Sequence, residues 1–385
     1  MTSPVTECAT AVDFAALPLS DSLRQVVAEL GFVVPTPIQA QAIPLLLAGE
    51  DLIGQSTTGS GKTAAFALPI LQKLNLAKRH AQALVLCPTR ELCTQVARDI
   101  RKLGRREAGL QVLIVSGGQP INPQLTALKQ GVHVVVGTPG RVLDHLKRSA
   151  LNLTGLTTLV VDEADRMLEM GFADEMEKIL SDAPVDRQTV FFSATYPRSI
   201  EKMSNAHQRH PARLTIAESE GPRTRQLAYD VGDQRRLETL LSVLRVDPPE
   251  SALVFCNLKA TVVQVEAALT AAGVAASSLH GGLEQKERDF VMAKFRNHST
   301  RVLVATDVAA RGLDIDGLDL VVNYDIPFQP EIYVHRIGRT GRAGKAGVAV
   351  SLVGAHDRGK LKAIEAASPT PLEWIAVAAE RPHAA

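Results

Sequence analysis

Short apolar runs recur along the chain, each followed by a polar or glycine-rich turn and then by apolar positions at helical spacing. In the first half these runs are Ala83 to Cys87, Val112 to Val115, His133 to Val136, Thr158 to Val161 and Thr189 to Phe192. In the second half they are Ala252 to Cys256, Arg301 to Ala305, Leu320 to Asn323 and Val348 to Leu352. Strands that are apolar on both faces are typical of parallel sheets covered by helices on both sides. The pattern therefore predicts an α/β protein with two doubly wound parallel sheets.

The length of the chain favours two domains, because 385 residues exceed what one hydrophobic core normally organises. Residues 217–224 lack apolar periodicity and contain a Gly-Pro pair, which is typical of a linker. We expect an N-terminal domain over 1–216, this linker, a C-terminal domain over 225–365 and a tail over 366–385. The tail, rich in Ala and Pro around Trp374, is expected to be a helix end with a frayed terminus.

The net charge is only +1, so any nucleic-acid binding has to depend on locally placed basic groups. One basic cluster lies on an amphipathic helical pattern, and we interpret it as a solvent-exposed face rather than an RNA site. It consists of Arg98, Arg101, Lys102, Arg105 and Arg106. No secretion signal and no run of about 18 apolar residues is present, which favours a cytosolic enzyme without a membrane segment.

The cysteines, four in number, have no paired spacing, so the sequence indicates neither a structural zinc site nor a disulfide framework. Cys87 and Cys256 lie in apolar runs and are predicted to be buried thiols.

A glycine-rich loop, Ser56-Thr57-Thr58-Gly59-Ser60-Gly61-Lys62-Thr63, follows the short segment Asp51 to Gly54 and precedes a helical pattern. In such a loop backbone N–H groups surround phosphates, Lys62 supplies charge at the β and γ positions, and Thr63 offers a hydroxyl to Mg²⁺. The general pattern has Gly where this chain has Ser56. The Gly-Lys-Thr ending favours a nucleotide-binding loop over a simple turn before a helix.

The tetrad Asp162-Glu163-Ala164-Asp165 directly follows the run Thr158 to Val161. Its two adjacent carboxylates fall at the carboxyl end of a predicted parallel strand, where open α/β sheets bind ligands. We expect Asp162 to hold Mg²⁺, directly or through water, and Glu163 to orient and deprotonate the attacking water.

The segment His335 to Arg342 places arginines three residues apart in the second half. We expect it to start a helix and to project Arg336, Arg339 and Arg342 to one side. Phosphoryl transfer needs positive charge on the γ-phosphate, a role that commonly falls to an arginine finger. The alternative is a solvated basic face.

These motifs resemble those of the DEAD-box ATP-dependent RNA helicases, from about Phe14 to about Val353. The further motifs of that family occur in its order. They are Gly31-Phe32 with Pro35 to Gln39, Pro88 to Leu92, Gly117-Gly118, Thr138 to Arg141, Ser193 to Thr195, Gln285 with Arg288, Ala305 to Asp307 and Ala310 to Asp314. The resemblance implies two RecA-like domains in tandem and ATP hydrolysis that depends on RNA.

The resemblance implies that Gln39 contacts the edge of adenine while Phe14 stacks on its face, as amides and aromatic rings do with bases. The residues it assigns to ATP are Phe14, Phe32, Pro37, Gln39, the loop Ser56 to Thr63, Asp314 at the ribose, and Arg339 and Arg342 at the γ-phosphate. Asp165, Ser193, Thr195 and His335 are implied to couple nucleotide state to domain arrangement, Ser193 and Thr195 by bonding the carboxylates of the tetrad. Family members typically have Ala at the position of Ser56.

For RNA the resemblance implies a set rich in Gly and Thr and poor in side chains that read bases. The set is Pro88, Thr89, Arg90, Gly118, Thr138, Pro139, Gly140, Arg141, Gln285, Arg288, Thr306, Arg311 and Gly312. Such a composition suits binding to the sugar-phosphate backbone, with the base sequence unread. Thr138 to Arg141 should begin a helix whose amide groups can face a phosphate.

Within the family, Gln119-Pro120, Ser278 to Gln285 and Arg301 to Asp314 are most like a bacterial member that acts on ribosomal RNA through a small C-terminal RNA-binding domain. Because the chain stops soon after Trp374, we expect that module to be missing. The expected activity is separation of short RNA duplexes or remodelling of RNA–protein complexes, with large-subunit ribosome assembly as one role. An ATP-gated RNA clamp and a DNA-directed P-loop ATPase stay open as alternatives, and a 2′-hydroxyl requirement would exclude most of the second. Without coiled-coil heptads, a monomer is expected.

Overall fold

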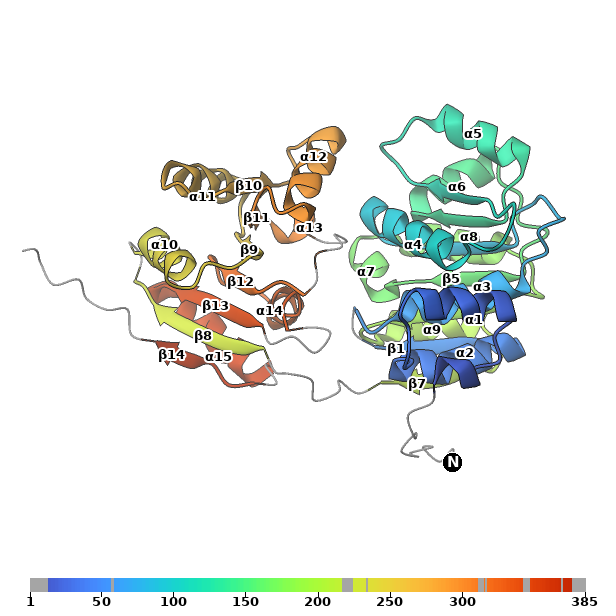
Figure 1. The fold of residues 1–385 in the computed structure, drawn as a ribbon, viewed down its shortest axis with the longest axis horizontal. Coiled ribbons are helices and arrows are strands. Elements are labelled where there is room, and N and C mark those ends of the chain that lie inside the picture. The colour runs from blue at the N-terminus through green and yellow to red at the C-terminus, as the bar shows by residue number, and fades with distance from the viewer. Residues whose placement is uncertain are drawn as a thin grey trace, which may run out of the picture. The chain divides into compact units, whose positions relative to one another are not determined.

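A computed structural model describes residues 13–56, 59–216, 224–232, 235–310, 315, 317–341, 347–367 and 370–375. The chain divides into two compact units, Met1–Glu218 and Ser219–Ala385. Each unit contains a seven-stranded sheet whose paired strands all run parallel, with helices on both faces (Figure 1). The predicted fold class of two doubly wound parallel sheets is therefore confirmed.

The first unit alternates strands and helices along the chain. Its strands are β1 (Leu52–Gln55), β2 (Ala83–Leu86), β3 (Val112–Val115), β4 (Val134–Gly137), β5 (Thr158–Val161), β6 (Gln188–Ser193) and β7 (Ala212–Thr215). Its helices are α1 (Asp21–Glu29), α2 (Pro37–Ala48), α3 (Lys62–Lys73), α4 (Arg90–Leu103), α5 (Ile121–Gln130), α6 (Pro139–Lys147), α7 (Ala164–Glu169), α8 (Ala173–Asp182) and α9 (Arg198–His207). The strands lie in the order β3-β4-β2-β5-β6-β1-β7.

Alternate residues of each central strand enter two separate cores. Val134 and Val136 pack with residues of α2, α3 and α4 on one face of the sheet. Val135, Leu159 and Val161 pack with residues of α6, α7, α8 and α9 on the other face. This two-sided burial explains why the strands are continuous apolar runs, because a side chain on either face is removed from water.

The second unit repeats this plan. Its strands are β8 (Arg225–Asp230), β9 (Ala252–Phe255), β10 (Ala276–Leu279), β11 (Val302–Ala305), β12 (Leu320–Asn323), β13 (Val348–Val353) and β14 (Glu373–Ile375). Its helices are α10 (Arg236–Val246), α11 (Lys259–Ala271), α12 (Gln285–Arg296), α13 (Asp307–Ala310), α14 (Pro330–Ile337) and α15 (Arg358–Ala367). The strand order β10-β11-β9-β12-β13-β8-β14 matches that of the first unit position by position.

The sequence pattern missed the strands that are not apolar on both faces. β7, β8 and β10 lie toward the sheet margins and are only partly buried. β1 is buried but contains Gly54, where a Cβ would lie 2.4 Å from the Phe192 ring. Close packing therefore requires glycine at this position, and a glycine makes the strand harder to recognise from the sequence.

The expected structure of the tail around Trp374 was wrong. Residues Glu373–Ile375 form the strand β14, which pairs in parallel with Leu227 to Tyr229 of β8. Trp374 stays half exposed, and Glu373 forms an ion pair with Arg225. A three-residue edge strand is too short to give a periodic signal in the sequence.

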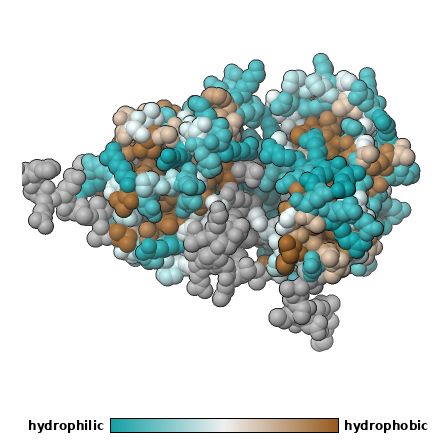
Figure 2. Space-filling model, in the orientation of Figure 1, coloured by the Kyte–Doolittle hydropathy of each residue, from teal (hydrophilic) through white to brown (hydrophobic). Residues whose placement is uncertain are grey.

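The cysteines and the basic cluster lie in the part of the chain that the structure describes, apart from Cys8. Cys87 and Cys256 are buried, as predicted. The five basic residues from Arg98 to Arg106 are exposed, and the surface over α4 is largely hydrophilic (Figure 2). Arg105 and Arg106 both pair with Glu29. Among the described residues, no helix has the length and apolar character that crossing a bilayer requires.

Candidate functional site

The predicted nucleotide motifs follow three neighbouring strands of the first sheet. The glycine-rich loop follows β1, the tetrad follows β5, and Ser193 ends β6, which lies between them. Because parallel strands present their carboxyl ends at one edge, the fold gathers these motifs from positions more than a hundred residues apart in the sequence.

The glycine-rich loop is closed on itself by two side chains. Lys62, the first residue of α3, donates from Nζ to the Ser56 carbonyl at 2.9 Å and is almost fully buried. Ser60 Oγ donates to Ser56 Oγ at 3.0 Å. The hydroxyl that distinguishes Ser56 from the family's usual residue is therefore part of the loop's own bonding. Thr57 and Thr58 lie outside the described residues.

The segment predicted to bind adenine is joined to the end of this loop. Gln39 accepts from the Thr36 N–H at 2.9 Å and donates from Nε2 to the Gly61 carbonyl at 3.1 Å. Gly61 has a φ of 93°, and a Cβ there would lie 2.3 Å from Gln39 Nε2. Only glycine suits both the left-handed conformation and this approach.

The aromatic and proline residues of the segment are fixed by packing. Phe14 is buried, and its ring centroid lies 5.8 Å from that of Phe32. Pro37 is the first residue of α2, where its missing N–H leaves no bond unmade.

Asp162 is a buried carboxylate at the end of β5. It is 3% exposed, and its Oδ1 accepts from the Glu163 N–H at 3.0 Å. Burial raises the pKa of Asp162 to about 6, although the positive charge of Lys62 acts against this rise. Lys62 therefore balances the negative charge of Asp162 only in part, and a cation bound beside this carboxylate would balance the rest.

Glu163 is held by an arginine that the sequence interpretation missed. Its backbone is left-handed, with φ 52° and ψ 53°. Its Oε2 accepts from Arg166 Nη1 at 2.8 Å, and both side chains are largely buried. A left-handed glutamate is uncommon and has an energetic cost, so the surrounding contacts must fix it.

Asp165 connects the tetrad to the segment Ser193 to Thr195. Its Oδ2 accepts from the N–H groups of Ala194 and Thr195 at 3.1 and 2.8 Å, and from Thr195 Oγ1 at 3.0 Å. The bond from Thr195 is the one expected. Ser193 differs from the expectation, because its Oγ accepts from the Asp165 N–H at 3.2 Å instead of donating to a carboxylate.

The chemistry of the site suits Mg²⁺ in the presence of phosphate. No group of three or more His, Cys, Asp or Glu side chains within the described ranges can hold a metal by itself. Mg²⁺ usually keeps several waters and is bound by one or two carboxylates together with substrate phosphates. The Asp162 carboxylate and the Thr63 hydroxyl, at the start of α3, are hard oxygen ligands of this kind.

The segments predicted to bind RNA follow the adjacent strands β2, β3 and β4. Arg90 lies against the turn at Gly118, where φ is 70° and a Cβ would be 1.5 Å from Arg90 Nη1. Arg141 donates from Nη1 to the Gln119 carbonyl at 3.3 Å. The three segments therefore lie together at the carboxyl ends of β3, β4 and β2, next to the nucleotide motif that follows β5.

Two of these segments begin helices, and the start at Thr138 to Arg141 is the one predicted. Thr89 is the N-cap of α4 and accepts from the Leu92 N–H at 3.3 Å. Thr138 is the N-cap of α6, with Pro139 in the first turn. A Cβ at Gly140 would meet nothing within 4 Å, so the start of α6 is open at this residue. Pro88 is buried at the end of the turn after β2.

In the second unit the predicted RNA-binding residues lie around α12 and α13. Gln285, at the start of α12, donates to Asp289 at 3.0 Å, and Arg288 donates to the Ala309 carbonyl at 3.3 Å. Thr306 precedes α13, and its Oγ1 accepts from the Ala309 N–H at 3.4 Å. The predicted residues Arg311, Gly312, Asp314 and Arg342 lie outside the described residues.

The expected arrangement of the second-unit arginines was wrong. α14 ends at Ile337, so the segment from His335 is a helix end and not a helix start. Arg336 is 1% exposed, whereas His335 is exposed and Arg339 is half-buried just beyond the helix. These residues therefore do not project to one side, because the helix ends between them.

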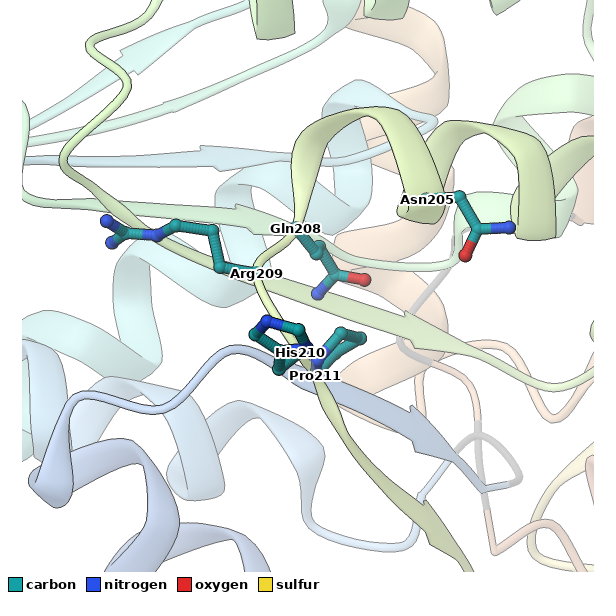
Figure 3. Close-up of a pocket in the computed structure, with 5 residues that line it drawn as sticks. All are labelled: Asn205, Gln208, Arg209, His210 and Pro211. Atoms are coloured by element: carbon teal, nitrogen blue, oxygen red, sulfur yellow. The ribbon is translucent and has the colours of Figure 1, made fainter. Parts of the chain in front are cut away.

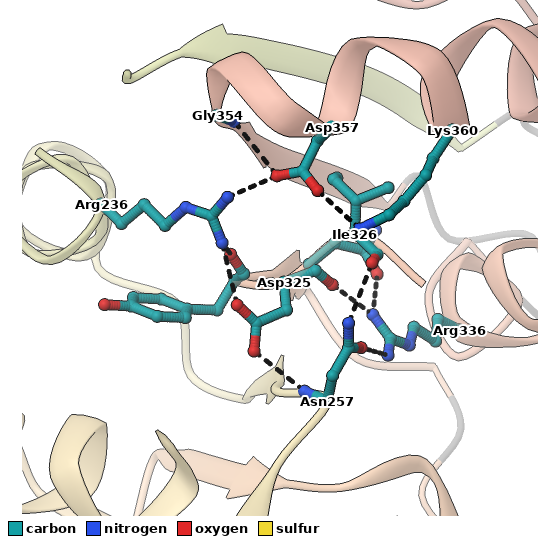
Figure 4. Close-up of polar contacts among 10 residues, drawn as sticks. Arg236, Asn257, Asp325, Ile326, Arg336, Gly354, Asp357 and Lys360 are labelled. Carbon is teal, nitrogen blue, oxygen red and sulfur yellow. Dashed lines mark hydrogen bonds and ion pairs between the residues drawn. The ribbon is translucent and has the colours of Figure 1, made fainter. Parts of the chain in front are cut away.

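The Arg336 guanidinium is enclosed by acceptors from three segments, and Figure 4 shows its contacts with Asn257 and Asp325. Its Nε and Nη2 donate to the two oxygens of Asp307 at 2.7 Å each, and Nη1 donates to Asn323 and to the Asp325 carbonyl. Nη2 also donates to Asn257 at 2.8 Å. A neighbouring network continues from Asp325 through Arg236 and Asp357 to Lys360. In the sequence Arg336 is one of three spaced arginines, and only the fold shows that its hydrogen bonds hold several segments of the second unit together.

A surface hollow elsewhere on the first unit does not belong to this site. It is lined by Asn205, Gln208, Arg209, His210 and Pro211 (Figure 3). Gln208 donates to the carbonyls of Leu52 and Thr189, and the Arg209 N–H donates to Asp51. The hollow precedes β7 and thus lies at the amino edge of the sheet, opposite the glycine-rich loop.

Comparisons with known proteins agree on one family. A family model described as DEAD/DEAH box helicase matches residues 36–203, and one described as helicase conserved C-terminal domain matches residues 235–344. The ATP-dependent RNA helicase DbpA of Escherichia coli is 46% identical over 347 residues, which cover 90% of this chain and 76% of that protein. The DEAD-box ATP-dependent RNA helicase CshA of Bacillus cereus is 46% identical, covering 91% of this chain and 67% of that protein.

Solved structures show the same architecture. S. cerevisiae Dbp5 bound to RNA and ADP BeF3 is 31% identical, with a TM-score of 0.83, covering 94% of this chain and 95% of that chain. A DEAD box protein from Methanococcus jannaschii is 39% identical, with a TM-score of 0.58, covering 94% of this chain and 99% of that chain.

Replacing Arg336 by Met should destabilise the second unit strongly, because Asp307 and Asn257 would lose their donor inside the protein. Truncating one partner of a buried pair typically costs about 3–5 kcal/mol. Urea unfolding of the full chain measures the loss. Arg358→Met is the matched control, because Arg358 pairs with Asp230 on the surface, where such pairs contribute about 0–1 kcal/mol. Equal losses in the two variants would contradict the assignment.

Replacing Asp162 by Asn should stabilise the nucleotide-free protein at neutral pH. The folded-state pKa of about 6 exceeds the ordinary value of 3.8, so the stability that this group contributes is lost as the pH rises through about 6. A buried, ionised Asp162 then costs on the order of 1–3 kcal/mol at pH 7. Thermal unfolding between pH 4 and pH 8 should show an advantage of the variant that shrinks toward pH 4. The exposed control Asp182→Asn should show no such trend; a pH-independent advantage of Asp162→Asn would contradict the interpretation.

Proposed function

Because this chain belongs to the DEAD-box family of ATP-dependent RNA helicases, we propose that it uses RNA-stimulated ATP hydrolysis to separate short RNA duplexes or to remodel RNA–protein complexes. The observation that carries this proposal is the arrangement of the first sheet edge. The motifs after β5, β6 and β1 have the chemistry for a nucleotide, and those after β2, β3 and β4 have the chemistry for a phosphate backbone. The two sets share one edge.

The nucleotide half of the proposal assigns each residue a task. The loop from Ser56 to Thr63 binds the phosphates through backbone N–H groups and Lys62, which must leave the Ser56 carbonyl to do so. Thr63 and Asp162 would hold Mg²⁺, which would balance negative charge on the bound phosphates. Glu163 orients and deprotonates the attacking water, with Arg166 holding the carboxylate in one orientation.

The adenine and coupling residues keep the roles that the family implies. Gln39 and Phe14, with Phe32 and Pro37, recognise the base. Asp165 belongs to the tetrad, and its carboxylate accepts hydrogen bonds from Thr195. A movement of the tetrad when the nucleotide changes would therefore move the Ser193 to Thr195 segment. In the second unit we assign Arg339 and Arg342 to the γ-phosphate, Asp314 to the ribose and His335 to coupling.

The RNA half of the proposal rests on backbone contacts. The start of α6 and the Gly117-Gly118 turn offer N–H groups, and Arg90 and Arg141 offer charge. Dbp5, which has the same architecture, has been solved with RNA and ADP BeF3. Base stacking amounts to about 1.4 kcal/mol per step in DNA, so opening four or five steps needs on the order of 6 kcal/mol. The free energy of binding a bent single strand can supply this amount, and ATP hydrolysis then releases the strand.

Three finer assignments stay predictions. A role in assembly of the large ribosomal subunit rests on the family resemblance, whereas a cytoplasmic location and a monomeric state rest on sequence composition and pattern. An RNA clamp with little unwinding is the second candidate function; it differs in a long RNA-bound lifetime without duplex separation. The relatives support an RNA helicase over a DNA-directed ATPase.

The function is tested by the rate of ATP hydrolysis with ribosomal RNA, unrelated RNA and DNA of equal length. We expect either RNA to raise the rate at least about tenfold and DNA to have little effect, because the 2′-hydroxyl distinguishes the two. Equal stimulation by DNA would contradict the proposal. A strand-displacement assay on a short RNA duplex then separates a helicase from a clamp.

Replacing Glu163 by Gln should leave ATP and RNA binding intact while lowering kcat by about 10²–10⁴, the usual contribution of a general base. Steady-state hydrolysis and binding of a fluorescent ATP analogue measure the two properties. Glu169→Gln, an exposed position at the end of α7, is the control and should behave as wild type. Near-normal turnover by Glu163→Gln would refute its role as the base.

A further inference from the structure

Helix α5 (Ile121–Gln130) buries a polar side chain where it packs on the first sheet. The buried residue of this helix is Gln124, which is 5% exposed. An amphipathic helix normally buries apolar residues, and a buried amide is unfavourable unless its donors and acceptor are bonded. The contacts of Gln124 therefore indicate why a glutamine occupies this position.

The Gln124 amide bonds to two other segments of the first unit. Its Nε2 donates to the Ser116 carbonyl at 3.2 Å. Its Oε1 accepts from His145 Nε2 at 2.8 Å and from Arg141 Nη1 at 3.2 Å. Ser116 and His145 are themselves buried. The opposite amide orientation would place an NH₂ group against the Arg141 guanidinium, so the network fixes one orientation.

The segments joined by Gln124 are those that we assign to RNA. Ser116 directly precedes the Gly117-Gly118 turn, against which Arg90 lies. Arg141 ends the Thr138 to Arg141 motif, and its Nη1 also donates to the Gln119 carbonyl. A single amide thus connects α5 with the turn after β3 and with the first turn of α6.

We propose that Gln124 is a positioning residue for RNA binding, which holds the Gly117-Gly118 turn and the start of α6 at a fixed separation. This inference rests on the proposed function. Backbone recognition adds several weak contacts that must be made together, so a small shift of one segment lowers the affinity for RNA as a whole. Nucleotide binding depends on the loop after β1 and does not use this network.

The test replaces Gln124 by Leu, which keeps the size and removes the hydrogen bonds. The RNA concentration for half-maximal ATPase stimulation should rise about tenfold, consistent with the loss of one or two net hydrogen bonds. The KM for ATP and the rate at saturating RNA should stay within about twofold of wild type. Fluorescence anisotropy with a labelled RNA at fixed salt measures the affinity directly, and a thermal melt establishes that the variant is folded.

Two further variants separate positioning from general stability. Leu128→Ala removes an apolar contact of α5 with the core but leaves the amide network, so it should weaken the fold without changing RNA affinity. Gln124→Glu keeps the acceptor for Arg141 and His145 and loses the donor to Ser116, so its RNA affinity should lie between those of wild type and Gln124→Leu. In a double-mutant cycle with Arg141→Met, the two losses should be less than additive because they act through one contact.

Each outcome bears on the inference. Unchanged RNA affinity in a folded Gln124→Leu variant overturns it, as does an equal loss of affinity in Leu128→Ala or full additivity with Arg141→Met. If wild type itself shows neither RNA binding nor RNA stimulation, the proposed function fails, and this inference fails with it. Wild-type stimulation combined with an unaffected Gln124→Leu variant contradicts the positioning role alone.

Discussion

The parallel direction of all strands is the constraint on which the rest of the first unit depends. It brings the carboxyl end of every strand to the same edge, so loops far apart in the sequence become neighbours. In the order β3-β4-β2-β5-β6-β1, the loops that we propose for RNA follow the first three strands and those that we propose for the nucleotide follow the last three. The boundary lies between β2 and β5, where the Asp162 N–H donates to the carbonyl of Leu86 at the end of β2. The two sets of loops therefore meet at a pair of directly hydrogen-bonded strands.

Within this frame, three buried polar or charged side chains are of two kinds. Arg336 and Gln124 have their partners inside the protein, and both fix the relative positions of segments. Asp162 has only an incomplete partner in Lys62, and its raised pKa is the sign of that deficit. The first kind of site is structural, whereas the negative charge of the second is one that a bound cation would balance.

The sequence predicted the fold class and the positions of the central strands because two-sided burial leaves a continuous apolar run. It did not predict β7, β8, β10 or β14, which are edge or half-buried strands with no such run, nor the buried β1, where Gly54 weakens the signal. The nucleotide loop and the tetrad were found from their consecutive residues, and the RNA motifs were found through the family resemblance. The roles of Arg166, Gln124 and Arg336 were not, because each depends on a partner brought near by the fold. Arg336 in particular resembled Arg339 in the sequence, but α14 ends between these two residues.

The identical strand order of the two units makes β8 the counterpart of β1. After β1 the chain continues into the loop that ends in Gly61-Lys62-Thr63, whereas β8 is followed by Val231-Gly232-Asp233-Gln234-Arg235. The repeated framework therefore carries one phosphate-binding loop and not two. Two sheets with the same strand order therefore differ in the chemistry of equivalent loops, because the Gly-Lys-Thr ending that follows β1 is not repeated after β8.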